Sequence, residues 1–275
     1  MTQFAECYLL IFGQLAVGGI AALAVPPFAT IERGFYKSSA GIFLGSALLY
    51  LIGMTALVAR AGIGSASVAT WVELFAWTLF TGCTAFYLAS LWDESHARRV
   101  RWYPRALFTG LAALVVTATT YRIDGGLGPA TVLYPFAFIT GALSLGAVAT
   151  GMLLGHWYLI DLGLSIHPLA RLFRYFVVVT IAHVIVILLT MGVLAASRGP
   201  AADAVALLWR AYLPLLVARL ALGPLAALGI AYLIHRTLAI PHTMAATGLF
   251  YIAILFVLVG EMLGRLILFR TSLPL

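Results

Sequence analysis

Long apolar runs alternate with short polar connections along the whole chain. A helix of about 20 apolar residues crosses the hydrocarbon core of a bilayer, so each run predicts a membrane-spanning helix. The pattern predicts an all-α, polytopic membrane protein with eight transmembrane helices, in which residues 1–275 form a single transmembrane domain. The eight runs cover residues 7–28, 40–58, 71–92, 106–121, 130–158, 172–196, 204–236 and 243–268.

The seventh run is longer than one span needs, and it contains Pro214 and Pro224. Proline removes a backbone hydrogen bond and bends a helix. We expect one kinked span over residues 204–236, and a short interfacial helix followed by a span is the alternative. If the run instead makes two spans, the C-terminus lies on the other side of the membrane.

Basic residues are distributed unevenly between the two sides. The connections after runs one, three, five and seven hold nine of them: Arg33, Lys37, Arg98, Arg99, Arg101, Arg105, Arg171, Arg174 and Arg236. The remaining connections and the C-terminal segment hold four: Arg60, Arg122, Arg198 and Arg270. Lys and Arg concentrate on the cytoplasmic side of membrane proteins. We therefore expect both termini on the outer side of a bacterial inner membrane.

Composition agrees with this architecture and excludes several classes of protein. Hydrophobic residues make up 63% of the chain and charged residues 9%, with a net charge of +7, whereas about 25% of a soluble domain is charged. Membrane orientation accounts for the positive charge, so the expected partner is the lipid bilayer and not nucleic acid. Cys7 and Cys83 form no C-x-x-C pair, which argues against an Fe–S cluster. No nucleotide-binding glycine motif occurs.

Small residues line one side of the fifth run. If this run is helical, Gly146 falls on the same stripe as His156, and Gly151 and Gly155 fall on the neighbouring stripe. A flat cofactor such as a quinone or a haem could approach such a face closely, so we assign the three glycines to cofactor binding. Close packing against another helix is the alternative, because small residues serve that purpose equally well.

Polar and aromatic residues gather at the predicted cytoplasmic end of the same run. His156, Trp157 and Tyr158 are followed by Asp161. The predicted catalytic residues are His156, Tyr158 and Asp161, which could exchange protons with a bound quinone, while Trp157 lines its site. The alternative is an aromatic belt at the membrane interface around a hydrogen-bonded histidine.

A haem b would need two axial histidines at matching depth. His183 lies eleven residues into run six, roughly 15 Å deep at 1.5 Å per residue. His156 and His235 both lie near the cytoplasmic end, so this pair is the candidate for haem iron ligation. His183 is included among the cofactor-binding candidates, with a hydrogen bond to a neighbouring helix or a proton relay as its expected role.

Charged residues inside the last two runs suggest a different class of site. Charges within a bilayer are costly and need partners. Glu261 and Arg265 can pair along one helix because they are four residues apart. Arg219 has no such local partner, so we expect it to bind an anionic group or an acid from another span, such as Glu73.

The preferred functional hypothesis is an integral-membrane subunit of a respiratory or electron-transfer complex, which binds quinone and one haem b near the cytoplasmic face. Little of the chain lies outside the predicted spans, so other subunits of the complex would carry any further redox centres. In architecture the chain resembles the eight-helix quinol-interacting subunits of the polysulfide-reductase type. The alternatives are a transporter or lipid-handling protein that uses Arg219 and Glu261, and a structural or assembly subunit without a site.

Overall fold

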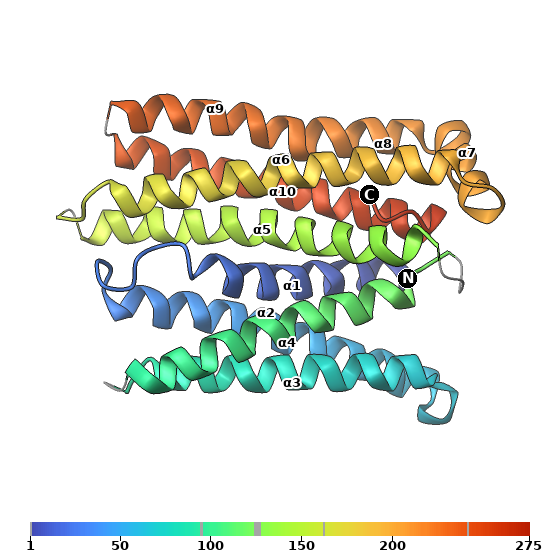
Figure 1. The fold of residues 1–275 in the computed structure, drawn as a ribbon, viewed down its shortest axis with the longest axis horizontal. Helices are drawn as coiled ribbons and strands as arrows, with labels where there is room; N and C mark the ends of the chain where they lie inside the picture. The colour runs from blue at the N-terminus through green and yellow to red at the C-terminus, as the bar shows by residue number, and fades with distance from the viewer. Residues whose placement is uncertain (1, 94–95, 124–127, 162, 241) are drawn as a thin grey trace.

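The computed structural model describes residues 2–93, 96–123, 128–161, 163–240 and 242–275, with the side chains of Thr2, Gln3 and His96 left out. These residues form helices and no strand (Figure 1), so the predicted all-α fold is confirmed. The helices are α1 (Thr2–Ala22), α2 (Arg33–Ala61), the short 3₁₀ turn η1 (Ile63–Ser65), α3 (Val68–Ser90), α4 (His96–Thr120), α5 (Ala130–Ile160), α6 (His167–Ala196), α7 (Pro200–Ala211), α8 (Leu213–Leu220), the π-helical turn η2 (Ala221–Leu225), α9 (Ala226–Ala239) and α10 (Thr243–Thr271).

Seven of the described helices are long and apolar enough to cross a membrane, and they indicate a membrane protein. Helix α4, which contains all but the last residue of the predicted span at residues 106–121, is 25 residues long but is not among these seven apolar helices. Its first turns hold four arginines, at positions 98, 99, 101 and 105. An eighth span therefore stays a prediction.

The region predicted as one kinked span differs from that prediction in its first part. Residues 200–211 form the separate short helix α7, and the crossing helix begins only at Leu213. It continues to Ala239 as one apolar unit, with the π-helical turn η2 in its interior. The alternative of a short helix followed by one span therefore describes this region better. Because the region crosses the bundle once, both chain termini lie at the same end (Figure 1).

Helix α5 lies at the centre of the bundle. Of its most apolar stretch 78% is buried, the highest share among the seven apolar helices. It packs against α1, α4, α6 and α10, so that α2, α3 and α4 lie on one side of the α1–α5 pair and α6, α9 and α10 on the other (Figure 1). We call the end of the bundle that carries the nine basic residues the basic end, and the opposite end the terminal end.

The residues at the helix ends explain where several helices begin and stop. Helix α1 ends at Ala22, and Pro26 and Pro27 follow shortly afterwards and cannot continue it. The Ser67 side chain accepts a hydrogen bond from the Thr70 amide, 3.2 Å away, and caps α3. Helix α6 begins with a proline in its first turn, where the missing N–H carries no penalty.

Candidate functional site

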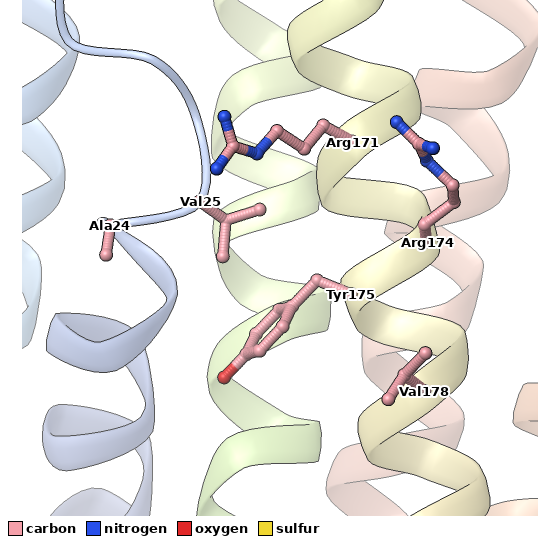
Figure 2. A pocket seen from close by; sticks show the side chains of 6 residues that line it. All are labelled: Ala24, Val25, Arg171, Arg174, Tyr175 and Val178. Atoms are coloured by element: carbon pink, nitrogen blue, oxygen red, sulfur yellow. The ribbon is translucent and has the colours of Figure 1, made fainter.

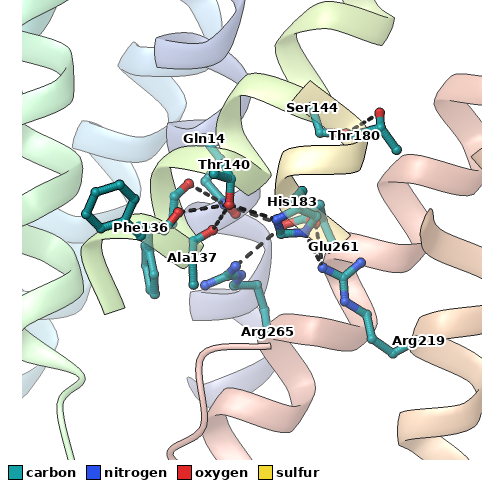
Figure 3. A network of polar contacts seen from close by, with 11 residues as sticks. Gln14, Phe136, Ala137, Thr140, Ser144, Thr180, His183, Arg219, Glu261 and Arg265 are labelled. Atoms are coloured by element: carbon teal, nitrogen blue, oxygen red, sulfur yellow. Dashed lines mark hydrogen bonds and ion pairs between the residues drawn. The ribbon is translucent and has the colours of Figure 1, made fainter. Parts of the chain in front are cut away.

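A buried polar network joins α6, α8 and α10 within the bundle (Figure 3). Arg219 Nη2 lies 2.7 Å from Glu261 Oε1 and 2.7 Å from His183 Nε2. His183 Nε2 lies 2.9 Å from the same Glu261 oxygen. The three residues are at most 3% exposed. These three atoms therefore form a closed triangle of short polar contacts without access to solvent.

Two further groups contact the second oxygen of the Glu261 carboxylate. Arg265 Nη2 and Gln14 Nε2 each lie 3.4 Å from Oε2. The Gln14 amide also donates a hydrogen bond to the backbone carbonyl of Phe138 on α5. The Arg265 guanidinium carbon lies 4.2 Å from the centre of the Phe138 ring, a cation–π contact. Helices α1 and α5 thus complete the network.

The kink in the crossing helix determines where Arg219 lies. Pro224 lacks an N–H and its ring clashes with the carbonyl four residues earlier, and the π-helical turn accommodates this defect. Gly223 at the turn packs directly on Gly260 of α10, where an added Cβ on Gly260 would lie 2.4 Å from the Gly223 Cα. This close approach of two helix backbones places Arg219, one turn before the kink, against Glu261.

The hydrogen bonds of the network have two arrangements that differ by one proton. The Thr140 hydroxyl lies 2.8 Å from the Phe136 carbonyl, to which it donates, and 2.9 Å from His183 Nδ1. A neutral imidazole therefore carries its proton on Nδ1, and its Nε2 accepts a hydrogen bond from Arg219. In that arrangement Nε2 and Glu261 Oε1 face each other as two acceptors. A proton added to Nε2 converts this contact into a hydrogen bond to Glu261.

Positive charge exceeds negative charge in the network. Arg219 and Arg265 contribute two guanidinium groups, and Glu261 contributes one carboxylate. Within the described part of the chain, Arg219 Nε and Arg265 Nε and Nη1 have no hydrogen-bond partner, and neither has Gln14 Oε1. A cavity of about 10 Å³ lies against His183, Arg219 and Glu261. This volume holds roughly one water molecule.

The predicted catalytic residues have separate surroundings. The exposed His156 ring lies 3.2 Å through its Nδ1 from the Tyr251 hydroxyl on α10. Tyr158 is buried and donates a 2.5 Å hydrogen bond to the Ser165 carbonyl. Asp161 follows the last residue of α5 and accepts a hydrogen bond from the Gly163 amide. The structure brings these three side chains into no shared hydrogen-bond network among its described residues.

Trp157 and the three glycines contact neighbouring helices. The Trp157 ring packs on Phe35 of α2, with ring centroids 6.3 Å apart. An added Cβ on Gly146 would lie 1.9 Å from the Gly18 backbone of α1. At Gly151 and Gly155 it would meet Phe250 and Thr247 of α10, at 2.4 and 2.7 Å. The small-residue face of α5 is therefore filled by α1 and α10, as the alternative of close helix packing predicted.

The predicted haem ligands contact different helices. His235 on α9 stacks on Phe173 of α6, with ring centroids 6.2 Å apart. A groove of about 440 Å³ runs beside it, and the residues that line this groove do not include His156. His156 instead contacts α10 through Tyr251. The two imidazoles therefore have different neighbours and share no groove among the described residues, and haem ligation by this pair stays a prediction.

Sequence reasoning identified His183, Arg219, Glu261 and Arg265 but not their arrangement. Arg219 pairs with Glu261 instead of Glu73. Glu73 lies with α2 and α4, where its Oε1 accepts hydrogen bonds from Tyr50 and Thr117 at 2.6 and 2.7 Å. The contribution of Gln14 and Thr140 was not foreseen, because a single amide or hydroxyl in a span gives no distinctive pattern.

Comparison of the sequence with protein-family models and with curated proteins finds no match. The function proposed below is therefore based on the chemistry and geometry of the described residues.

Proposed function

We propose that this chain is a proton-translocating membrane protein, a transporter in which His183 and Glu261 carry the proton. The observation that supports this function is the triangle of His183 Nε2, Glu261 Oε1 and Arg219 Nη2, with sides of 2.7, 2.7 and 2.9 Å. Ionisable groups inside a membrane are costly, and they are found mostly where protons or ions pass. This triangle has two hydrogen-bonding arrangements that differ by a single proton.

The proton step needs no partner other than water. In one arrangement His183 Nε2 accepts from Arg219. When Nε2 takes a proton from a hydronium ion, which leaves as water, the imidazolium donates to Glu261 and the hydrogen bond from Arg219 is released. Loss of the same proton to a water molecule on the other side restores the first arrangement. The adjoining cavity of about 10 Å³ has room for roughly the one water molecule that delivers or receives this proton.

The kinked α8–α9 helix is the element that would open the cavity beside His183 to water. Switching transitions often use hinges at helix interruptions, and π-helical turns are frequent at functional sites. Arg219 lies just before the π-helical turn Ala221–Leu225, and Pro224 lies within it. When Arg219 gains or loses its hydrogen bond to His183, the change therefore occurs next to the π-helical turn, which acts as the hinge. We propose that protonation of His183 changes the bend of the α8–α9 helix and opens the cavity toward one end of the bundle.

Proton flux into liposomes tests the proposal. Purified protein is reconstituted with a trapped pH-sensitive dye, and a potassium diffusion potential drives protons inward. We expect acidification faster than in protein-free liposomes and a return to the protein-free rate in His183→Gln. Glutamine keeps an amide that can bond Arg219 and Glu261 but cannot take up the proton, so this variant should fold.

The matched control is His242→Gln, since His242 is exposed at the start of α10 and has no contact with the network. This variant should retain the wild-type flux. Elution volume and thermal midpoint establish that each variant is folded before its flux is compared. A wild-type protein that conducts no faster than empty liposomes under either polarity contradicts the proposal, and so does full flux in His183→Gln.

A second candidate function is quinone binding, which the groove beside His235 favours. Phe173, Val177, Leu228 and Tyr232 line this groove, and Arg174 and His235 supply hydrogen-bond donors. Such a site can hold a flat ring against an aromatic side chain and bond its carbonyl oxygens. In this function the chain would be the quinone-binding subunit of an electron-transfer complex, as the sequence analysis proposed, with the site at His235 and not at His156.

A photoreactive quinone analogue tests this second candidate. We expect it to label residues 228–235 and expect unmodified quinone to compete with the labelling. His235→Leu should weaken the labelling, whereas His242→Leu should not. Labelling spread evenly over the lipid-facing surface, or unchanged in His235→Leu, excludes a specific quinone site in this groove.

A further inference from the structure

A groove at the basic end lies between the end of α1 and the first turns of α6. Its volume is about 670 Å³, and it is lined by Ala24, Val25, Arg171, Arg174, Tyr175 and Val178. The two guanidinium groups lie toward its outer part and the apolar side chains lie below them (Figure 2). The lower part of the groove is apolar apart from the Tyr175 hydroxyl, which points away from the two guanidinium groups (Figure 2).

This groove lies beyond the end of α1, at a level where α6 still forms helical turns. Helix α1 ends at Ala22, and the chain then continues through Pro26 and Pro27 without forming a helix. Helix α6 extends along the same level with complete turns, and α5 passes behind the space between them (Figure 2). Residues 23–26 after α1 form turns and bends instead of a further helical turn, and Ala24 and Val25 of this segment line the groove.

Positive charge at the groove has no counter-charge within the described part of the chain. Arg171 and Arg174 are exposed and make no hydrogen bond or ion pair with any described residue. No acidic residue lines the groove. Both arginines lie within the first eight residues of α6. The electrostatics therefore favour an anionic ligand.

We propose that this groove binds a membrane phospholipid with an anionic headgroup, its phosphate held between Arg171 and Arg174 and one acyl chain lying over Val25 and Val178. Guanidinium groups match the geometry of phosphate oxygens. Basic pockets between transmembrane helices bind anionic lipid headgroups. The Val178 side chain is 64% exposed one turn below Arg174, which leaves an apolar surface where the chain would lie. This site is independent of the proton pathway.

Lipid retention tests the proposal. Protein purified in detergent is equilibrated with an equimolar mixture of phosphatidylglycerol and phosphatidylcholine, and bound lipids are counted by native mass spectrometry. We expect selective retention of phosphatidylglycerol. Two basic residues near a membrane surface together strengthen anionic lipid binding roughly 30-fold, so Arg171→Gln/Arg174→Gln should weaken retention by about this factor. The matched control Arg198→Gln/Arg210→Gln removes the same charge at the terminal end and should retain the lipid.

Two further measurements separate headgroup binding from groove binding. Val178→Trp fills the groove without changing its charge, and it should displace phosphatidylglycerol while leaving the protein folded, since Val178 is exposed. Millimolar inorganic phosphate should not compete. Equal retention of the two lipids, equal losses in the two arginine double variants, unchanged retention in Val178→Trp, or displacement by inorganic phosphate would each overturn the proposed site.

Discussion

Replacing Glu261 by glutamine should lower the free energy of unfolding by about 3–5 kcal/mol, the usual cost of removing one partner of a buried ion pair. Glu261 is 1% exposed and contacts Arg219 at 2.7 Å, His183 at 2.9 Å and Arg265 at 3.4 Å. Glutamine keeps the volume and one acceptor oxygen but removes the negative charge. Two buried guanidinium groups then remain without a carboxylate, and the new amide N–H groups face other donors.

The matched control for this substitution is Glu73→Gln in the other half of the bundle. Glu73 is 3% exposed, but its Oε1 accepts hydrogen bonds from hydroxyl groups, those of Tyr50 and Thr117. No ion pair to Glu73 occurs in the described ranges of the chain. An amide oxygen can accept the same two hydrogen bonds, so the expected cost is about 1 kcal/mol.

Both variants are measured by equilibrium unfolding in mixed micelles, where the free energy is compared with that of the wild type. A double variant, Glu261→Gln/Arg219→Gln, adds a thermodynamic cycle. Removing both charges should recover part of the loss, because fewer buried cations then remain unpaired. If Glu73→Gln costs as much as Glu261→Gln, or if Arg219→Gln adds its full cost to Glu261→Gln, charge pairing does not stabilise this network.

Two smaller predictions concern helix packing and the α5–α6 connection. Gly146→Ala places a Cβ 1.9 Å from the Gly18 backbone and should destabilise the protein by about 1–3 kcal/mol. The control Gly192→Ala lies in open space on α6 and should be neutral or stabilising by up to about 1 kcal/mol. Equal unfolding free energies for the two variants would contradict tight α1–α5 packing. Tyr158→Phe removes the hydrogen bond to the Ser165 carbonyl and should lower the free energy of unfolding by about 1 kcal/mol. Amide exchange in residues 163–166 should become faster. Unchanged exchange there means that this hydrogen bond does not stabilise the α5–α6 connection.

The apolar pattern was sufficient to predict the helices because each span must satisfy its backbone hydrogen bonds internally. It was less informative about the region after residue 200, where α7 is itself apolar enough to merge with the following span. It also could not distinguish an open face from a packed one. Gly146, Gly151 and Gly155 meet the same requirement for small side chains whether a cofactor or another helix lies against them.

The positions of Arg219, Glu261 and His183 along their helices indicate that the three side chains lie at similar depth. Arg219 lies twenty residues from the basic end of its helix at Ala239, Glu261 lies eighteen from Thr243, and His183 lies sixteen from His167. At 1.5 Å per residue these positions are about 30, 27 and 24 Å from that end. The three side chains are therefore nearly level. Hydropathy began the sixth span at residue 172, which omitted five helical residues and made His183 look shallower than it is.

Matching depth is necessary for a contact but does not select the neighbour. The close pair Gly223 and Gly260 supplies that selection, because an added Cβ on Gly260 would overlap the Gly223 backbone. A glycine on each of two helices, both at the level of buried charges, predicts that these helices touch there. Applied to this chain, that criterion pairs the kinked helix with α10 and so pairs Arg219 with Glu261. It gives no reason to pair Arg219 with Glu73, which lies beyond the central α1–α5 pair with α2 and α4.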